Sequence, residues 1–245
     1  MLDEFRLMMD ELAMAGAAYR LFRDPTRLQD VLDTGTRITA GIDLEKFAKR
    51  LGDMAPWTKE QLRTRRVLDY DPVALGKCAP GTLGRAVHDH CAKWEITPKI
   101  FENTRPNETP GQHILVNIEN THDIWHPVMA MEAAPPGEVG VQAFYMGQMP
   151  NLLGVLCIGI AHFRVLKYTP LEYPVLMDTV ARGWILGKRA LPLFGVPWEE
   201  WFDRPLADVR KELHVDVDEV RAFMDRGTAE ADKRTKILKG LGKQF

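Results

Sequence analysis

Residues 170–191, with the sequence PLEYPVLMDTVARGWILGKRAL, repeat their apolar side chains at intervals of three and four residues. This spacing is typical of a helix that buries one face. The residues predicted to share that face are Leu176, Val180, Trp184 and Leu191. Gly183 and Gly187 lie one turn apart and leave room where another helix can approach closely. The segment therefore predicts a core helix that packs against a second helix.

The same period continues on both sides of this segment, so the 245-residue chain is predicted to adopt an all-α fold. Further helices are expected at about residues 82–94, at 113–131 and from Glu138 onward. Helix starts are also predicted at Asp24-Pro25 and at Thr58, because Asp and Thr side chains can accept unpaired backbone N–H groups. The predicted interruptions are a break at Pro135-Pro136-Gly137, a kink at Pro150 and a connection over residues 97–112.

The composition is that of an ordinary soluble domain, with 45% hydrophobic and 27% charged residues. We expect a single helical domain over residues 1–245, in which residues 113–225 carry the chemistry and residues 226–245 form a basic tail. The tail is predicted to be a solvated helix, with contact to anionic lipid headgroups as the alternative. The net charge of −2 gives no field that would attract nucleic acid. The most apolar run, Leu152 to Ala161, has ten residues, whereas a membrane span needs about 20.

The first residues and the cysteines indicate a compartment. Residues 1–5 carry acidic side chains at once and have no basic segment leading into an apolar stretch, so neither a signal peptide nor a transit peptide is expected. Cys78, Cys91 and Cys157 are odd in number and lack close-spaced pairs, which favours a reducing environment. We therefore expect a cytoplasmic protein, with peripheral attachment to the inner face of a membrane as a further expectation.

Two histidines carry the clearest chemical signal. His122 and His126 are four residues apart, so on a helix they lie one turn apart on the same face. Asp123 is adjacent, and Glu138 follows the proline break, where a turn of the chain can bring its carboxylate back beside the imidazoles. Two imidazoles and a carboxylate are a donor set that divalent transition metals bind. The spacing alone also fits packed or surface histidines, and that structural role is the alternative.

The four residues His122, Asp123, His126 and Glu138 match the pattern H-D-x-x-H-x(11)-E at every fixed position. This is the signature of the coenzyme Q biosynthesis protein 4 family, which the chain resembles over about residues 24–215. The other similar segments are residues 80–85, 137–145, 183–193, 198–199 and 204–206. The helical fold that the resemblance implies agrees with the apolar periodicity.

The resemblance also implies roles for these residues. His122, His126 and Glu138 would be metal ligands, and Asp123 would be either a fourth ligand or an outer base that holds an imidazole in one tautomer. The residues that would take part in catalysis are His122, Asp123 and Glu138. The metal would be zinc, with iron or magnesium as alternatives. No other cofactor is implied.

In this family the proposed reaction is oxidative decarboxylation of a prenylated, hydroxybenzoate-like acid, in which a hydroxyl group replaces the carboxyl group at ring carbon 1. The resemblance therefore implies a metal-dependent enzyme of ubiquinone biosynthesis. An older interpretation makes the family a non-catalytic, lipid-binding scaffold that organises the biosynthetic complex. That scaffold role is the alternative function here, and a helical interaction module with an unused motif is a third.

An apolar stripe follows Glu138 along the chain. The residues predicted to line a groove for an isoprenoid tail are Tyr145, Met149, Leu152 and Leu156. The same spacing fits an ordinary core helix, because apolar helical stripes are usually packed. The expected partners are a prenylated aromatic or isoprenoid lipid, enzymes of quinone biosynthesis, a membrane surface and a second copy of the chain, without nucleic acid.

Pro127 departs from the family pattern, which usually has a helix-compatible apolar residue at this position, followed by Thr-Gly. Proline inside a helix removes one hydrogen bond and crowds the carbonyl group four residues earlier, here that of Asp123. The helix is therefore predicted to kink or end close to the site, and a related substrate from a specialised pathway becomes an alternative. His88, His90 and Cys91 also cluster, but Cys91 lies on the apolar face of its helix, so packing is expected rather than metal binding.

Overall fold

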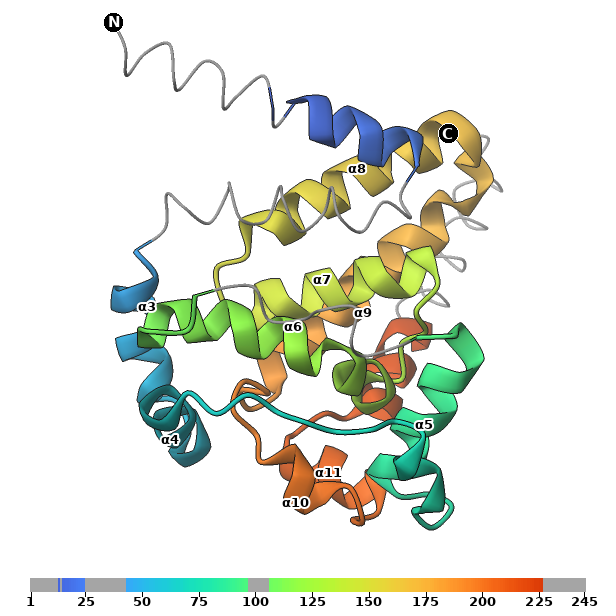
Figure 1. The fold of residues 1–245 in the computed structure, drawn as a ribbon. Helices are drawn as coiled ribbons and strands as arrows, with labels where there is room; N and C mark the ends of the chain where they lie inside the picture. The colour runs from blue at the N-terminus through green and yellow to red at the C-terminus, as the bar shows by residue number, and fades with distance from the viewer. Residues whose placement is uncertain (1–12, 14, 25–42, 97–105, 227–245) are drawn as a thin grey trace, which may run out of the picture.

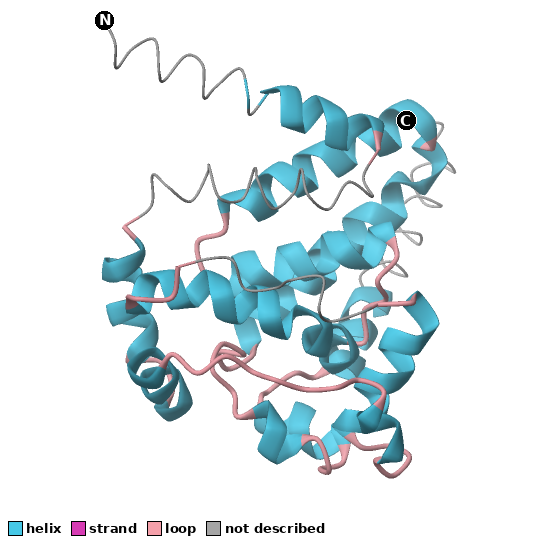
Figure 2. Cartoon of the chain, viewed as in Figure 1, coloured by secondary structure: helices cyan, strands magenta, loops and turns pink. Residues whose placement is uncertain are grey.

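The computed structural model describes residues 13, 15–24, 43–96 and 106–226, and every regular element among them is helical (Figure 2). The elements are α3 (Leu44–Gly52), α4 (Pro56–Thr64), η1 (Ala74–Lys77), α5 (Leu83–Trp94), α6 (Pro110–Met129), α7 (Pro135–Gln148), α8 (Leu152–Tyr168), η3 (Pro170–Glu172), α9 (Tyr173–Arg189), α10 (Trp198–Trp201) and α11 (Leu206–Glu212). The predicted all-α fold is confirmed. The residues after Asp24, where a helix is predicted to start, lie outside the described residues, as do most of the 97–112 connection and nearly all of the basic tail.

The helices α6 and α7 lie at the centre of the molecule, with α3 and α4 at one end and α5 at the other (Figure 1). α3 and α5 both pack against α6, and α10 and α11 lie below it in the same view. A hydrophobic core extends from Ala48 in α3 to Val220 near the end of the described chain. Its largest fully buried side chains include Trp125 of α6 and Phe144 of α7. The pair of central helices that carries the metal motif is therefore held inside the core.

The most extensive packing between described helices joins α7 and α9. A Cβ atom added at Gly183 would overlap the carbonyl oxygen of Gly140, and one added at Gly187 would overlap that of Phe144. The predicted close approach at the two glycines is therefore confirmed. The predicted buried face is partly wrong, because Trp184 is 44% exposed. α9 turns its glycines, together with Leu176 and Leu186, toward the core.

The helix α8 forms an outer layer over α7, and a helix over residues 15–23 lies against it (Figure 1). Arg164 donates a hydrogen bond to the carbonyl oxygen of Phe22, and the rings of Phe22 and Tyr168 lie 5.9 Å apart. α8 is apolar along most of its length, yet Gly154 is the only buried residue in it. Among the described residues, no helix is both long enough and apolar enough to cross a membrane.

Several helix starts differ from the predicted ones because prolines begin helices here. α4 starts at Pro56, and Thr58 accepts the backbone N–H of Ala55 from inside the first turn instead of preceding the helix. α7 starts at Pro135. Proline lacks a backbone N–H group, and this costs nothing in the first turn because N–H groups there have no acceptor inside the helix. Pro150 does not kink a helix but lies between α7 and α8.

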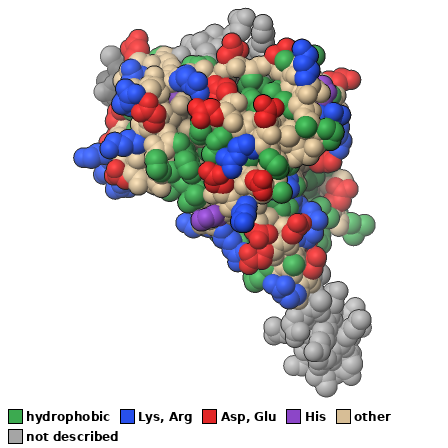
Figure 3. Space-filling model, turned by 90° about the horizontal axis from the view of Figure 1, so that it is seen from below, with side chains coloured by type: hydrophobic (Ala, Val, Ile, Leu, Met, Phe, Trp, Pro, Cys, Tyr) green, Lys and Arg blue, Asp and Glu red, His purple; other side chains and the backbone are tan. Residues whose placement is uncertain are grey.

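The face seen in Figure 3 shows acidic and basic side chains interspersed with apolar ones.

Candidate metal centre

Helix α6 supplies both histidines from one rigid element. It begins with a reciprocal cap, in which the Thr109 hydroxyl accepts the N–H of Gln112 and the Gln112 amide oxygen accepts the N–H of Thr109. Glu45 of α3 also accepts the N–H of Gly111, so the start of α6 is tied to a neighbouring helix. The start at Pro110 is three residues earlier than predicted.

The end of α6 lies close to the histidines, as Pro127 predicts. The helix ends at Met129, and Ala130 takes a left-handed conformation with φ 51°. Two arginines from other helices bind carbonyl groups at this end of α6. Arg210 donates to the carbonyl oxygens of Pro127 and Val128, at 2.7 and 2.8 Å, and Arg182 donates to those of Met129 and Ala130. The backbone beside the histidines is therefore fixed from outside its own helix.

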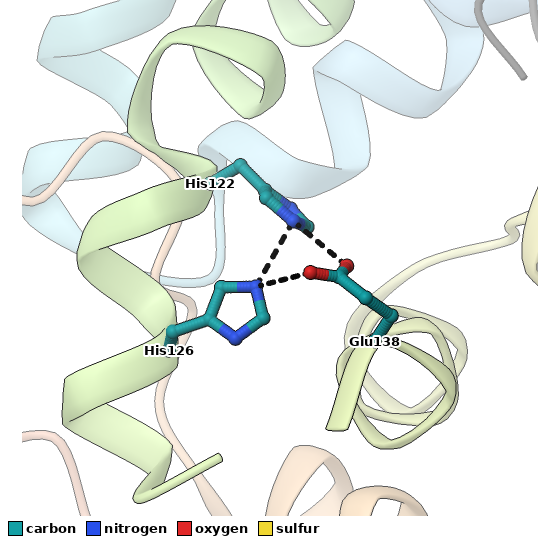
Figure 4. A group of neighbouring side chains, drawn as sticks. All are labelled: His122, His126 and Glu138. Carbon is teal, nitrogen blue, oxygen red and sulfur yellow. Dashed lines mark hydrogen bonds and ion pairs between the residues drawn. The ribbon is translucent and has the colours of Figure 1, made fainter. Parts of the chain in front are cut away.

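The turn between α6 and α7 brings Glu138 back to the histidines. Gly137 is required here, because a Cβ atom at this position would overlap the carbonyl oxygen of Glu132. Glu138 lies in the first turn of α7 and faces the two imidazoles across the corner (Figure 4). The carboxylate also lies where the positive end of the helix dipole favours negative charge. The predicted return of the chain after the proline break is therefore present.

The side chains of His122, His126 and Glu138 point toward one another (Figure 4). The two Nε2 atoms are 3.1 Å apart, and each lies 3.3 Å from one oxygen of Glu138. One ligand atom from each of the three residues lies within 4.8 Å of the other two. His126 is fully buried, whereas the Glu138 side chain is 41% exposed, so the group is open on the Glu138 side.

Outer hydrogen bonds orient both rings. The Nδ1–H group of His126 donates to the carbonyl oxygen of Met131 at 3.2 Å, while the N–H of Met131 donates to the carbonyl oxygen of His126. His122 Nδ1 lies 2.9 Å from the hydroxyl oxygen of Tyr145. With the proton on each Nδ1, both Nε2 atoms keep a lone pair that faces the centre of the group. Tyr145, predicted as a pocket residue, therefore contacts a predicted ligand.

Glu138 and His122 stabilise each other's charged forms. Burial opposes the charged form of His122, but the hydrogen bond and the charge of Glu138 outweigh it and raise the pKa of His122. Burial likewise opposes ionisation of Glu138, but the hydrogen bonds with His122 and His126 outweigh it and hold its pKa well below the ordinary value. Glu138 is therefore an anion at neutral pH, ready to balance a cation.

The donor set fits zinc. In a tetrahedral site with zinc–ligand distances of about 2.0–2.1 Å, neighbouring ligand atoms lie roughly 3.3 Å apart. The three observed separations of 3.1, 3.3 and 3.3 Å are close to that value. Two imidazoles and a carboxylate also suit iron, whereas magnesium prefers oxygen ligands. A metal ion held by His122, His126 and Glu138 would keep at least one position for an external ligand.

Asp123 does not belong to this group of ligand atoms. Neighbouring residues on a helix point in directions about 100° apart, so Asp123 cannot share the face of both histidines. Burial raises the pKa of Tyr70 and of Cys91, and the charge of Asp123 adds to both shifts, so Asp123 lies near Tyr70 and near Cys91 of α5. Burial raises the pKa of Asp123 itself. This placement suits the outer role implied for Asp123 better than the ligand role.

The predicted pocket residues have different surroundings. Tyr145 and Met149 are buried in the core, and Leu152 is 48% exposed at the start of α8. Leu156 is half-buried on α8. Burial raises the pKa of Cys157, the next residue, to about 11, and the charge of Glu138 adds to this shift, so the middle of α8 lies near the site. The pocket remains a prediction. A cavity of about 260 Å³ is lined by other residues, among them Met131, Gly137 and Arg182.

The structure separates the three residues of the second cluster. His88 Nδ1 bonds to the carbonyl oxygen of Pro72, and Cys91 is buried in the core, as expected from its position on the apolar face. His90 instead stacks on the ring of His126, with the ring centroids 4.9 Å apart. Burial, with the neighbouring His126, lowers the pKa of His90 to about 4. The sequence does not reveal this contact, because it depends on how α5 packs against α6.

Comparison with known proteins identifies similar chains. Residues 5–219 match the family model described as coenzyme Q (ubiquinone) biosynthesis protein Coq4. The chain is 29% identical to a ubiquinone biosynthesis protein COQ4 homolog, mitochondrial, from Aedes aegypti, over 65% of this chain and 57% of that protein. It is 27% identical to the corresponding Anopheles gambiae protein, over 83% of this chain and 72% of that one. The chain thus spans little more than half of the Aedes protein.

A solved structure has the same fold. The crystal structure of a candidate ubiquinone biosynthesis protein from Nostoc punctiforme PCC 73102 superimposes with a TM-score of 0.69. The match covers 84% of this chain and 98% of the other at 20% sequence identity. At that identity the likeness establishes the helical fold alone. It agrees with the helical architecture predicted from the apolar periodicity.

Proposed function

The chain belongs to the Coq4 family of coenzyme Q (ubiquinone) biosynthesis proteins, and from that premise we propose that it is a metal-dependent enzyme acting on a prenylated aromatic acid. The observation that carries the proposal is the convergence of His122, His126 and Glu138 within 4.8 Å at the α6–α7 corner. The reaction is the replacement of a ring carboxyl group by a hydroxyl group, with release of carbon dioxide. Because this is a two-electron oxidation, an external oxidant is required: with dioxygen and water as co-reactants, dioxygen takes up the two electrons and leaves as hydrogen peroxide, while the acid yields the phenol and carbon dioxide.

The residues of the site have separate tasks. His122, His126 and Glu138 hold the metal ion, which when bound supplies a positive charge that anchors the carboxylate or phenolate of the substrate. The carbonyl group of Met131 keeps the His126 imidazole in the tautomer that presents Nε2 to the site, and the Tyr145 hydroxyl can accept the Nδ1–H of His122 in the matching tautomer. Asp123 lies outside the group of ligand atoms, and we assign it the outer role, in which its negative charge acts on the neighbouring ligand His122.

The exposed apolar face of α8 suits an apolar, prenylated substrate. α8 carries Val155, Phe163 and Leu166, each more than half exposed, and Leu171 follows in η3 at 94% exposed. Arg164 and Lys167 lie on the same helix, which contains no acidic residue. An apolar face with basic and without acidic side chains matches an anionic membrane surface, where a prenylated substrate is dissolved. We assign this face to the membrane, and the tail groove along Tyr145 and Leu156 to the isoprenoid chain.

The enzyme assignment is tested with purified zinc-loaded protein and 3-geranyl-4-hydroxybenzoate in detergent, under air. The expected product has lost carbon dioxide and gained one oxygen atom, measured by mass spectrometry. Glu138→Gln and Asp123→Asn should each abolish product while the circular dichroism spectrum stays unchanged. Wild-type turnover with product at the same rate in either variant would contradict the assigned roles.

The second candidate function is a non-catalytic scaffold that binds lipid and enzymes of quinone biosynthesis. The exposed apolar face of α8 favours it, because such a face requires no chemistry at the metal. In that case His122→Ala would lower thermal stability and metal content, and the wild-type protein would show no turnover with any candidate acid. Binding of the wild-type protein to anionic vesicles in the absence of turnover would favour the scaffold. A homodimer and a cytoplasmic, membrane-peripheral location remain predictions.

A further inference from the structure

His90 is a buried polar side chain that the site described above does not use. It lies on α5, is only 9% exposed, and its Nε2 atom is buried without a hydrogen-bond partner. Buried polar atoms in native proteins are nearly always paired, and an unpaired one beside a functional site points to a partner that binds there. A phenylalanine would fill the same space without leaving a polar atom unpaired. Packing alone therefore does not account for a histidine at this position.

The position of the His90 ring restricts what its partner can be. The ring stacks on that of His126, with an interplanar angle of 23°. A metal ion bound at His126 Nε2 lies close to the plane of the His126 ring, because the nitrogen lone pair lies in that plane. The His90 ring lies above this plane, so its nitrogen cannot point at the same ion while the rings remain stacked. The partner that fits is a group bound to the ion on the His90 side.

The charges around His90 indicate the kind of group. The ionisable groups that act on it are His126, Glu138, His122 and Lys93, so three of the four belong to the site. A substrate carboxylate entering the site meets the negative charge of Glu138. A nearby N–H donor offsets that repulsion, and a hydrogen bond to an anionic oxygen is stronger than one between neutral groups.

We propose that His90 is a substrate-binding residue, whose Nε2–H group donates a hydrogen bond to a carboxylate oxygen of the acid held at the His122–His126–Glu138 site. The inference rests on the proposed function, because it assumes a metal ion and an aromatic acid at that site. His90 then selects for a carboxylate over a neutral ring. In the free protein the unpaired Nε2 atom of His90 destabilises the fold, because a buried polar group without a partner loses its hydrogen bonds to water. The bound acid supplies the missing partner.

The test uses the full chain loaded with Co²⁺, whose visible absorption reports both occupancy of the site and binding of an external ligand. The probe is 4-hydroxybenzoate. His90→Phe should bind Co²⁺ with an affinity within about threefold of wild type, because His90 is not a ligand. Its affinity for 4-hydroxybenzoate should fall by about tenfold or more, the loss expected for one hydrogen bond to a charged group. His90→Gln, which keeps an N–H donor, should recover most of this loss.

A matched control is His88→Phe, on the same helix but hydrogen-bonded to Pro72 away from the site, which should leave both affinities unchanged. Equal 4-hydroxybenzoate affinity in wild type and His90→Phe would overturn the proposal and leave His90 as packing. Loss of Co²⁺ binding in His90→Phe would also overturn it, by making His90 part of the metal-holding set. Wild-type protein that binds Co²⁺ but not 4-hydroxybenzoate would overturn the carboxylate partner while the metal centre stands. Wild-type protein that binds no Co²⁺ would remove the proposed function together with this inference.

Thermal stability and NMR give readouts that do not depend on the phenylalanine variant being active. If His90→Phe folds, it should unfold at the same or a higher temperature than wild type, because an unpaired polar atom has been removed. If it does not fold, ¹⁵N spectra of the histidine rings in the wild-type zinc protein decide the matter. Adding 4-hydroxybenzoate should shift one Nε2–H signal that is missing from His90→Gln. No such shift would overturn the proposal.

Discussion

Helices α8 and α9 each contain 17 residues and both pack on α7, yet they bury very different surfaces. α9 has the less apolar sequence of the two but brings Gly183 and Gly187 into backbone contact with α7. α8 has the more apolar sequence but buries only Gly154. Close packing in this protein is therefore decided by shape at the glycines rather than by the number of apolar residues. The surplus apolar surface of α8 is what we assign to lipid.

The largest effect expected from this contrast is on stability. Gly183→Val places side-chain atoms where the Gly140 carbonyl group lies, and it should lower the free energy of unfolding by at least about 3 kcal/mol. Urea denaturation followed by circular dichroism measures this loss. The control is Gly159→Ala in α8, where an added Cβ atom meets nothing within 4 Å.

Gly159→Ala should be neutral or stabilising by up to about 1 kcal/mol, because alanine favours the helix. If Gly159→Ala lost as much stability as Gly183→Val, α8 would be a packed core helix and the contrast between the two helices would be wrong.

The second largest effect is expected on the affinity of the α6–α7 corner for a metal ion. The raised pKa of His122 means that, in the metal-free protein, a proton competes with the metal up to a higher pH than at an isolated histidine. Affinity for zinc should therefore rise with pH through that pKa and level off above it, by about tenfold per pH unit where one proton is released. Competition with a chelator of known affinity, repeated at several pH values, measures the slope. The ordinary pKa of histidine is about 6.5. A flat affinity profile between pH 6 and pH 8 would therefore show that zinc binding displaces no proton from His122.

The smallest effect is expected on the outer face. Phe163→Ser should change the free energy of unfolding by less than about 0.5 kcal/mol, because the side chain is 69% exposed. It should nevertheless weaken binding to vesicles of phosphatidylcholine and phosphatidylglycerol several-fold, as a flotation assay would show. Val73→Ser is the matched control, since Val73 is 77% exposed but far along the chain from α8. Equal vesicle binding by both variants and wild type would remove the membrane assignment.

Much of the central architecture follows from local sequence rules. The spacing of His122 and His126 and the position of Glu138 after a turn are local properties, so the three ligand atoms could be predicted to meet. The close contact at Gly183 is predictable for the same reason, because glycines one turn apart mark a face. The start of α7 was harder to predict, because Pro135 and Pro136 suggest a break and yet occupy its first turn.

The remaining features depend on how distant elements meet. Stacking of His90 on His126 requires α5 to pack beside α6, and no local pattern encodes that arrangement. The two arginines that bind the end of α6 come from α9 and α11, more than 50 residues later in the chain. The exposure of Trp184 likewise reflects which face α7 covers. Apolar periodicity identifies a helix face but does not say which neighbour will bury it.

Elemental analysis of protein purified without chelators tests directly whether the α6–α7 corner holds a metal ion. We expect about one equivalent of zinc or iron per wild-type chain, and less than about a tenth of that in His126→Ala and in Glu138→Gln. His88→Ala, a histidine outside the site, should keep the wild-type metal content. Wild-type protein that carries no metal and takes up none when zinc or iron(II) is added, or equal metal in all four proteins, would show that His122, His126 and Glu138 do not form a metal site.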